Sequence, residues 1–467
     1  MAFVAQPAGP LRAGAAQVDI TPQGPVHLAG DIATHRPAKL VADPLYAKAL
    51  VLESGGRRLC LLTLDITIIT DRYSRLIREQ AAEPFGLDPA AVMVHALQSH
   101  SAPGMGRFMV DPDFPGIPAQ HEWIGGDEEA YSLWAADRAV EAIGRAVEAL
   151  EPVQIGMASG IEGRLAFNRR AVLRDGSIGM PGPTWPGGPL GPHWIRCIEG
   201  PMDPELGVIC LRNAALRIVA LVLHYTCHPV HVFPKPIVSA DWPGAWAAEM
   251  QQRTGAGVAL VVNGACGNIN PWPPFDPDYV EDHRRMGRLL AQNAEGVLEA
   301  ISFQDGTELG HCRRIAKLPL RELSPEELQR CEALLAAHPA PIFTDESQSL
   351  VDPEWIAAAS VYSVHLMRQR APHLDYEVQA FRLGPAAIVG LAGEPFVEAG
   401  LQIKLASPAY PTYIAHCCTQ YVGYIPTAEA LKRGGHEATT RYWAKLAPEA
   451  FGLIVAEAGE ALRGLDW

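Results

Sequence analysis

Short apolar segments alternate with polar or glycine-rich loops along this chain, which predicts strands joined in hairpins. The first predicted hairpin runs from Leu45 to Ile69 and turns at Gly55-Gly56. A second spans Leu206 to Thr226, and a third spans Tyr376 to Leu391. Each of the last two ends in an apolar strand that runs directly into a polar loop, so we expect polar side chains to be presented from rigid strand ends.

Helical periodicity occupies the remaining long segments. Helices are predicted over residues 128–150, 277–301, 324–336, 353–369 and 441–462, with Asp127, Ser324 and Asp352 as N-caps and a kink or break at Pro448. Strands and helices follow no strict βαβ order, so the predicted fold class is mixed α/β (α+β), with mixed sheets flanked by helices. We expect one large domain over residues 1–467, with two closely packed subdomains, about 1–305 and 306–467, as the alternative.

Composition narrows the classes of partner. The 467 residues are 48% hydrophobic and carry a net charge of −14, which disfavours nucleic acid and anionic membrane surfaces because no basic stripe is available for phosphates. No apolar run approaches the roughly 20 residues that span a bilayer. The nine cysteines form no CxxC pair, and no secretory signal is recognised, so we expect reduced cysteines and a cytoplasmic protein.

The first candidate functional residues follow the predicted apolar strand around Val92–Val94, in the segment QSHSAPG at residues 98–104. If the strand persists, Gln98 and His100 project from the same face while Ser99 points away. Two polar groups side by side at a strand end are typical of catalytic or metal-binding positions. The alternative is a capped strand with one hydrogen-bonded histidine.

Three further segments have the same form. One carries His224, His228 and His231, a second runs from Asn263 to Pro271 with small residues and amides, and a third carries Glu394. Two histidines and a glutamate from separate strand ends are a ligand set that catalytic zinc takes from proteins. Ordinary core histidines, a tight turn and a helix-start carboxylate are the structural alternatives.

These segments carry a resemblance. In order, the chain offers Val18-Asp19-Ile20-Thr21-Pro22, Gln98 to Gly104, Phe167-Asn168-Arg169-Arg170, His228-Pro229, Ser239-Ala240-Asp241-Trp242-Pro243-Gly244, Gly267-Asn268-Ile269-Asn270-Pro271, Gly393-Glu394-Pro395 and Tyr421-Val422-Gly423-Tyr424. They resemble the signature segments of the catalytic domain of neutral, non-lysosomal ceramidases. The resemblance implies a zinc-dependent amidase with the metal at the positions of Gln98, His228, Glu394 and Tyr424.

Two departures from the family pattern change that expectation. Gln98 stands where the family has a zinc-binding histidine, and an amide oxygen is a weaker zinc ligand than imidazole. We therefore expect either Gln98 or the neighbouring His100 to complete the site. Asn270 stands where the family has a serine, so no covalent catalysis is expected there, although the amide could orient substrate.

The resulting hypothesis is a hydrolase that cleaves an amide or related acyl bond of a small soluble molecule with metal-activated water. Zinc, or another divalent transition metal, is the expected cofactor. The expected catalytic residues are His100 and Asp241 for proton transfer, Arg169 and the 264–268 backbone for the oxyanion, and Asn270 and Tyr424. The expected substrate contacts are Trp185, Trp194, Asn268 and Tyr421.

Some questions stay open at this stage. The alternative function is a ceramidase-like protein that binds a ligand without hydrolysing it, because two family positions have changed. We expect no appended immunoglobulin-like domain and no stable membrane association, and we leave a homo-oligomer open. A phosphoryl or sulfuryl ester hydrolase is disfavoured because the candidate loops offer too few acidic ligands for two metals.

Overall fold

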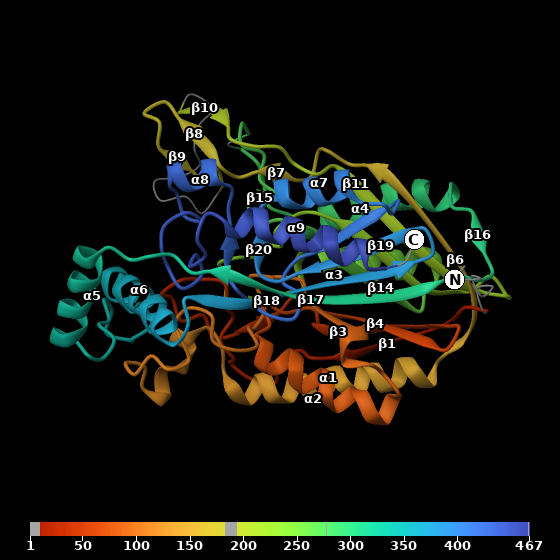
Figure 1. Cartoon of the computed structure of the whole chain (residues 1–467), viewed down its shortest axis with the longest axis horizontal. Coiled ribbons are helices and arrows are strands. Elements are labelled where there is room, and N and C mark those ends of the chain that lie inside the picture. Colours follow the sequence, from red (N-terminus) through yellow and green to blue (C-terminus); the bar gives the residue numbers. More distant parts are fainter. Residues whose placement is uncertain (1–9, 183–193, 277, 466) are drawn as a thin grey trace, which may run out of the picture.

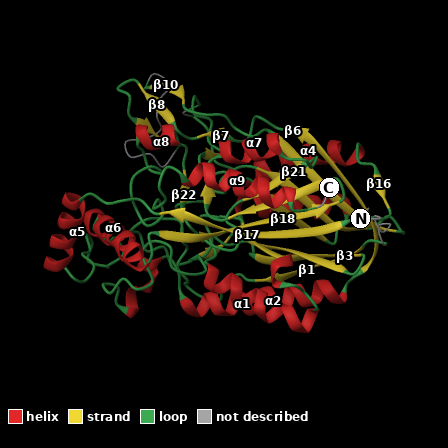
Figure 2. Ribbon diagram, viewed as in Figure 1, coloured by secondary structure: helices red, strands yellow, loops and turns green. Residues whose placement is uncertain are grey.

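A computed structural model describes residues 10–182, 194–276, 278–465 and 467. Two β-sheets lie face to face, and helices cover both outer faces (Figures 1 and 2). This four-layer arrangement confirms the predicted mixed α/β class. Within the described residues, no helix combines the length and the apolar character that crossing a bilayer requires.

The larger sheet has nine strands. Its order is β14 (Val258–Asn263), β12 (Ile218–Tyr225), β11 (Glu205–Asn213), β6 (Glu151–Ile161), β1 (Arg12–Asp19), β3 (Tyr46–Ser54), β4 (Arg57–Leu64) and β5 (Val92–Ala96), with β16 (Phe303–Gln304) paired to β6. Only its two outermost pairs, β12–β14 and β4–β5, are parallel. A parallel pair needs a crossover, and helices α3 (Asp241–Thr254) and α1 (Asp71–Phe85) provide the two crossovers.

The smaller sheet takes its strands from the later part of the chain. Its order is β17 (Leu309–Pro319), β18 (His373–Leu383), β19 (Ala386–Leu391) and β21 (Thr412–Ala415). Helix α7 (Val397–Ala406) makes the crossover between β19 and β21, which are parallel. The strands of the two sheets therefore divide between residues 304 and 309.

Side-chain alternation explains the layers. In β4, Leu59 and Leu61 pack between the sheets against residues such as Phe381, whereas Cys60 and Leu62 face the opposite layer. That layer is formed by α1 and α2 (Glu129–Glu148) on one half of the large sheet, and by α3 and α4 (His283–Glu299) on the other half. Helices α7 and α9 (Ala450–Arg463) cover the small sheet. Burial of each such side chain contributes about 1.5–3 kcal/mol.

The three predicted hairpins are confirmed as β3–β4, β11–β12 and β18–β19. Helix α5 (Pro325–Ala337) and helix α6 (Pro353–Arg370) begin at the predicted caps, where Ser324 and Asp352 accept backbone N–H groups. Three predicted helix starts were wrong. The last helix begins only at Ala450, two residues after Pro448, and α4 begins at His283 rather than at residue 277. The N-cap of α2 is Glu128 rather than Asp127.

Short strands and turns complete the described chain and carry much of the site. They are β2 (Leu40–Val41), β7 (Phe167–Asn168), β8 (Ala171–Leu173), β9 (Ile178–Gly179), β10 (Ile195–Ile198), β13 (Ile237–Val238), β15 (Ile269–Asn270), β20 (Glu394–Pro395), β22 (Tyr424–Ile425), helix α8 (Ala428–Arg433), and the 3-10 turns η1 (Pro89–Ala91) and η2 (Ala119–Gly125). Helices α5 and α6 stand together at one end of the molecule (Figure 1).

Candidate functional site

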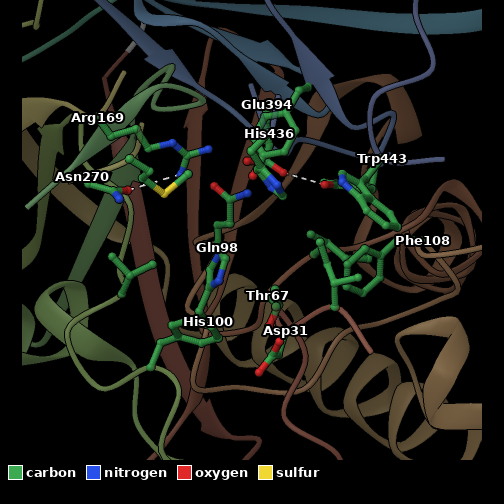
Figure 3. A pocket seen from close by; sticks show the side chains of 18 of the residues that line it. Asp31, Thr67, Gln98, His100, Phe108, Arg169, Asn270, Glu394, His436 and Trp443 are labelled. Carbon is green, nitrogen blue, oxygen red and sulfur yellow. Dashed lines mark hydrogen bonds between the residues drawn. The ribbon is translucent and has the colours of Figure 1, made fainter. Parts of the chain in front are cut away.

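A cavity of about 260 Å³ collects most of the predicted site residues (Figure 3). Its polar lining is Asp31, Thr67, Gln98, His100, Arg169, Asn270, Glu394, Tyr421, Tyr424 and His436. Its apolar lining is Ile32, Ile68, Phe108, Met109, Met180, Val230, Phe233, Trp272 and Trp443, with Gly30 completing the wall. The cavity thus combines a compact polar group with an extensive apolar and aromatic wall, as small-molecule sites do.

Two short strand pairs bring distant segments to this cavity. In the parallel pair β20–β22, Glu394 lies opposite Tyr424, and in the antiparallel pair β15–β7, Ile269 lies opposite Asn168, next to Arg169. Glycine is required at the first crossing, because Gly393 has φ 64° and a Cβ there would lie 2.5 Å from the carbonyl oxygen of Gly423. The close backbone approach therefore sets the Glu394–Tyr424 juxtaposition.

His228 is not part of the cavity lining, but it lies directly against Glu394, which is. His228 is fully buried, and its Nε2 lies 3.1 Å from Glu394 Oε2 while its Nδ1 lies 3.0 Å from the carbonyl oxygen of Ile269. A carbonyl only accepts, so Nδ1 carries the proton, and a neutral ring then points its Nε2 lone pair at a carboxylate oxygen. Burial, followed by the charge of Arg169, lowers the pKa of His228, which favours this neutral ring.

The Glu394 carboxylate is held ionised. Burial alone would raise its pKa, but the Tyr421 hydroxyl and the charge of Arg169 lower it, and a proton on His228 Nε2 would lower it further. The Tyr421 hydroxyl donates to Glu394 Oε1 at 2.5 Å. A charged oxygen and an imidazole lone pair therefore face each other across 3.1 Å.

Arg169 approaches from β7 with one nitrogen unused. Its Nη1 donates to Asn270 Oδ1 at 3.3 Å (Figure 3). Its Nε donates to Glu437 at 2.7 Å. Its Nη2 is buried and has no partner among the described residues, and its guanidinium carbon lies 5.4 Å from the centre of the Tyr424 ring. A buried donor without a partner costs roughly 1–3 kcal/mol, so the site holds an N–H group ready for an acceptor from a ligand.

Glu437 anchors both Arg169 and Arg170 from below the cavity. Its Oε2 accepts from Arg170 at 2.6 Å, and all three side chains are buried. Burial would raise the pKa of Glu437, but Arg169 and Arg170 lower it to about 2, against an ordinary value of 4.5. Because the pKa of the folded state is the lower one, the stabilisation is present above pH 4.5 and is lost as the pH falls toward 2.

We expect Glu437→Gln to reduce the free energy of unfolding by about 3 kcal/mol at pH 7, since it breaks a buried ion pair. The deficit should shrink as the pH is lowered from about 4.5 toward 2, which urea denaturation at several pH values would measure. Glu457→Gln is the matched control: its half-exposed pair with Arg314 should be worth under about 1 kcal/mol. A deficit that does not change with pH would contradict the ion-pair explanation.

The strand predicted to carry Gln98 and His100 ends earlier than expected. Strand β5 stops at Ala96, and Gln98 has φ 68°, so strand alternation does not extend to these residues. Both side chains nevertheless line the cavity. The amide of Gln98 lies beside His416, with Oε1 2.9 Å from Nε2, and the ring of His100 meets that of His228 edge-on at 5.6 Å.

Several predicted residues are placed elsewhere. Asp241 is buried against His231 and the backbone N–H of Val232, away from the cavity lining. The Asn268 side chain bonds Glu398 and the backbone of Val397. The exposed fraction of Trp194 is 58%, and this residue is not part of the lining either. The predicted contact at Trp185 lies outside the described residues.

Sequence reasoning missed four residues at or beneath the cavity: His416, His436, Glu437 and Trp443. His436 lines the cavity with its ring 5.5 Å from that of Tyr424, and burial lowers its pKa. Trp443 also lines the cavity, and its buried Nε1 has no partner among the described residues. None of the four stands at the end of a predicted strand. For three of the four, the sequence offers one signal of a site: histidine, glutamate and aromatic residues are clustered at 436–443.

Metal-ligating side chains are few. No group of three or more His, Cys, Asp or Glu side chains in the described ranges is arranged to hold a metal ion. His228 and Glu394 face each other and supply two such ligands, whereas Asp31, His100 and His436 line the cavity without forming such a group with them. A metal between His228 and Glu394 would therefore need neutral amide or phenol oxygens as well. Gln98, Tyr421 and Tyr424 offer those at the same cavity, with burial raising the pKa of both phenols.

Known structures share this fold. The crystal structure of neutral ceramidase from Pseudomonas aeruginosa superposes with a TM-score of 0.69 at 18% identity, covering 97% of this chain and 74% of that one. A ceramidase solved in complex with C2 gives a TM-score of 0.71 at 18% identity, covering 98% and 76%. No family model matches the chain, and no curated protein matches it by sequence. The chain therefore has a neutral ceramidase-like fold over nearly its whole length, which confirms the predicted resemblance at the level of fold.

Proposed function

We propose that this protein is a metal-dependent hydrolase that cleaves an amide bond of a small molecule in the Glu394 cavity. The observation that carries the proposal is the His228–Glu394 pair, in which a neutral imidazole lone pair faces an ionised carboxylate oxygen across 3.1 Å. Two acceptors at that distance repel each other unless a cation lies between them. A separation of about 3 Å also suits two ligands that each bind zinc at ~2 Å.

The donor set fits zinc bound by His228, Glu394 and neutral oxygens. His228 presents Nε2 because its Nδ1 is bonded to the Ile269 carbonyl, and such a bond on the far nitrogen commonly orients metal-binding histidines. Tyr424 lies opposite Glu394 in the β20–β22 pair, and Gln98 lines the same cavity. Zinc bound here would polarise a carbonyl and lower the pKa of bound water toward ~7.

Other residues of the cavity are proposed to bind and orient the substrate. The free Nη2 of Arg169 is proposed to donate to the substrate carbonyl oxygen, and Asn270 holds Nη1 so that the guanidinium keeps its orientation. Burial lowers the pKa of His100 to about 3, so at neutral pH this ring is uncharged and lines the cavity as a hydrogen-bonding group rather than as an efficient general base. Asp241 has no proposed role, because it lies off the cavity.

The volume and the apolar lining of the cavity favour a small substrate with an apolar part. Its volume of about 260 Å³ lies just below the 300–1,000 Å³ that is typical of ligand pockets. The aromatic wall around Phe108 and Trp443 would take an acyl chain or ring. The unpartnered indole N–H of Trp443 would suit a second acceptor on the substrate. We therefore propose a compact N-acyl amide in preference to a bilayer lipid.

Ligand binding without hydrolysis is the second candidate. It is favoured by Asn270, whose amide is no nucleophile and already accepts from Arg169, and by the neutral Gln98 near the proposed metal. Such a protein would bind an N-acyl amide and release it unchanged.

The proposal is tested by the metal content of protein purified without chelator, together with hydrolysis of a panel of N-acyl amides. We expect about one metal ion per chain and hydrolysis that chelation removes and added zinc, manganese or cobalt restores. Bound metal with saturable binding but no turnover would support the second candidate. Absence of stoichiometric metal would overturn the metal-hydrolase proposal.

A further inference from the structure

His416 is a fully buried imidazole beneath the cavity, directly after strand β21. It touches the cavity only through Gln98, whose Oε1 lies 2.9 Å from its Nε2. Its Nδ1 lies 3.0 Å from the carbonyl oxygen of Asn263. No hydrogen bond of the described residues joins the His416 ring to a carboxylate.

These contacts fix the tautomer of His416. The Asn263 carbonyl accepts, so the proton is on Nδ1 and the lone pair is on Nε2. Among the described residues, the hydrogen-bond partner nearest to that lone pair is the Gln98 amide, whose oxygen would oppose it. The Cys266 thiol lies farther away, 3.7 Å from Nε2, and is the weaker donor.

We infer that Gln98 donates an amide N–H to His416 Nε2, so that its carbonyl oxygen faces the cavity on the side of the His228–Glu394 pair. The oxygen and NH₂ ends of an amide have nearly the same shape, so the hydrogen-bond network decides which end points where. Turning the amide over exchanges its oxygen and its NH₂ group without moving the rest of the side chain. Gln98 therefore lines the cavity in either orientation.

This orientation makes Gln98 a metal ligand and His416 its positioning residue, an inference that rests on the proposed function. A freely rotating amide would have to be fixed with its oxygen toward the cation when the metal binds, which costs conformational entropy. His416 prevents that rotation, and the left-handed backbone of Gln98, with φ 68°, is held by its N–H bond to the Ile66 carbonyl at 3.0 Å. The chain thereby replaces one imidazole ligand with an oriented carbonyl.

The test is a double-mutant cycle read out as zinc affinity of the apo protein by chelator competition. We expect His416→Phe to weaken zinc binding about 10–100-fold, the usual effect of losing a ligand-orienting partner. In the Gln98→His background, where an imidazole needs no amide orientation, the same substitution should have a much smaller effect. Cys266→Ala, which removes a neighbouring side chain but keeps the His416–Gln98 bond, is the matched control and should leave affinity within about twofold.

A second readout is independent of metal. Long-range ¹H–¹⁵N spectra of the apo protein should show His416 as the Nδ1–H tautomer, and nuclear Overhauser effects should place the Gln98 amide protons near its ring. An Nε2–H tautomer would overturn the inference. So would an equal loss of affinity from His416→Phe in both backgrounds, since that would indicate general packing. Wild-type protein that binds no zinc would overturn the ligand role and the proposed function together, whereas zinc binding that is insensitive to His416→Phe overturns the inference alone.

Discussion

Replacing His228 with alanine is expected to remove the bound metal and to lower kcat/KM for amide hydrolysis by about 10³-fold or more. His228 and Glu394 are the imidazole and the carboxylate of the proposed metal site, and their facing atoms lie 3.1 Å apart. A catalytic metal contributes several kcal/mol of transition-state stabilisation, and each 1.36 kcal/mol is worth about tenfold in rate. Metal analysis and steady-state kinetics on the same preparation would measure both effects.

His231→Ala is the matched control for this experiment. His231 belongs to the same segment and is equally buried, but it bonds Asp241 and Tyr279 away from the cavity. We expect it to lower thermal stability while each folded molecule keeps its metal and its turnover. His228→Gln, which retains most of the side-chain volume, separates loss of the ligand from loss of packing. A His228→Ala protein that is folded and still holds stoichiometric zinc would place the metal elsewhere.

The elements that were predictable from sequence are those decided by local patterns. The hairpins β3–β4, β11–β12 and β18–β19 carry their turn residues and apolar alternation within about 25 residues. Gly55-Gly56 and the Ser324 cap are signals of the same local kind. Local signals fail where a tertiary contact decides, as at Gln98, whose left-handed backbone no strand pattern predicts.

The candidate site was predictable to the extent that its residues follow strand ends. Glu394, Arg169 and Tyr424 reach one cavity through two-residue strand pairs, too short to recognise in a sequence. Asp241 and Asn268 also follow strands, but each satisfies nearby backbone and side-chain groups instead of the cavity.

The residues beneath the site carry no such signal. Glu437 and His416 become important only because the chain returns beneath Arg169 and Gln98 from far along the sequence. Their roles depend on hydrogen-bond direction and on tautomer, and these are properties of the assembled structure rather than of any sequence pattern.

Substituting Arg169 with methionine is expected to lower kcat by about 10²–10³-fold, as the loss of a single oxyanion donor does in other hydrolases. The prediction follows from Nη2, which is buried and has no partner among the described residues, while Nε and Nη1 are engaged with Glu437 and Asn270. Steady-state kinetics at saturating metal would measure the change. Zinc affinity should fall much less than with His228→Ala, because Arg169 is no ligand.

The difficulty with Arg169→Met is that it also removes one partner of a buried carboxylate. Arg170 still pairs with Glu437 at 2.6 Å, so we expect a destabilised but folded protein. The double variant Arg169→Met/Glu437→Gln should recover part of the stability without recovering kcat. That separation distinguishes a donor to the reacting group from a structural ion pair. If kcat returned together with stability, Arg169 would act only by supporting the fold, and the free nitrogen in the cavity would have no part in the reaction.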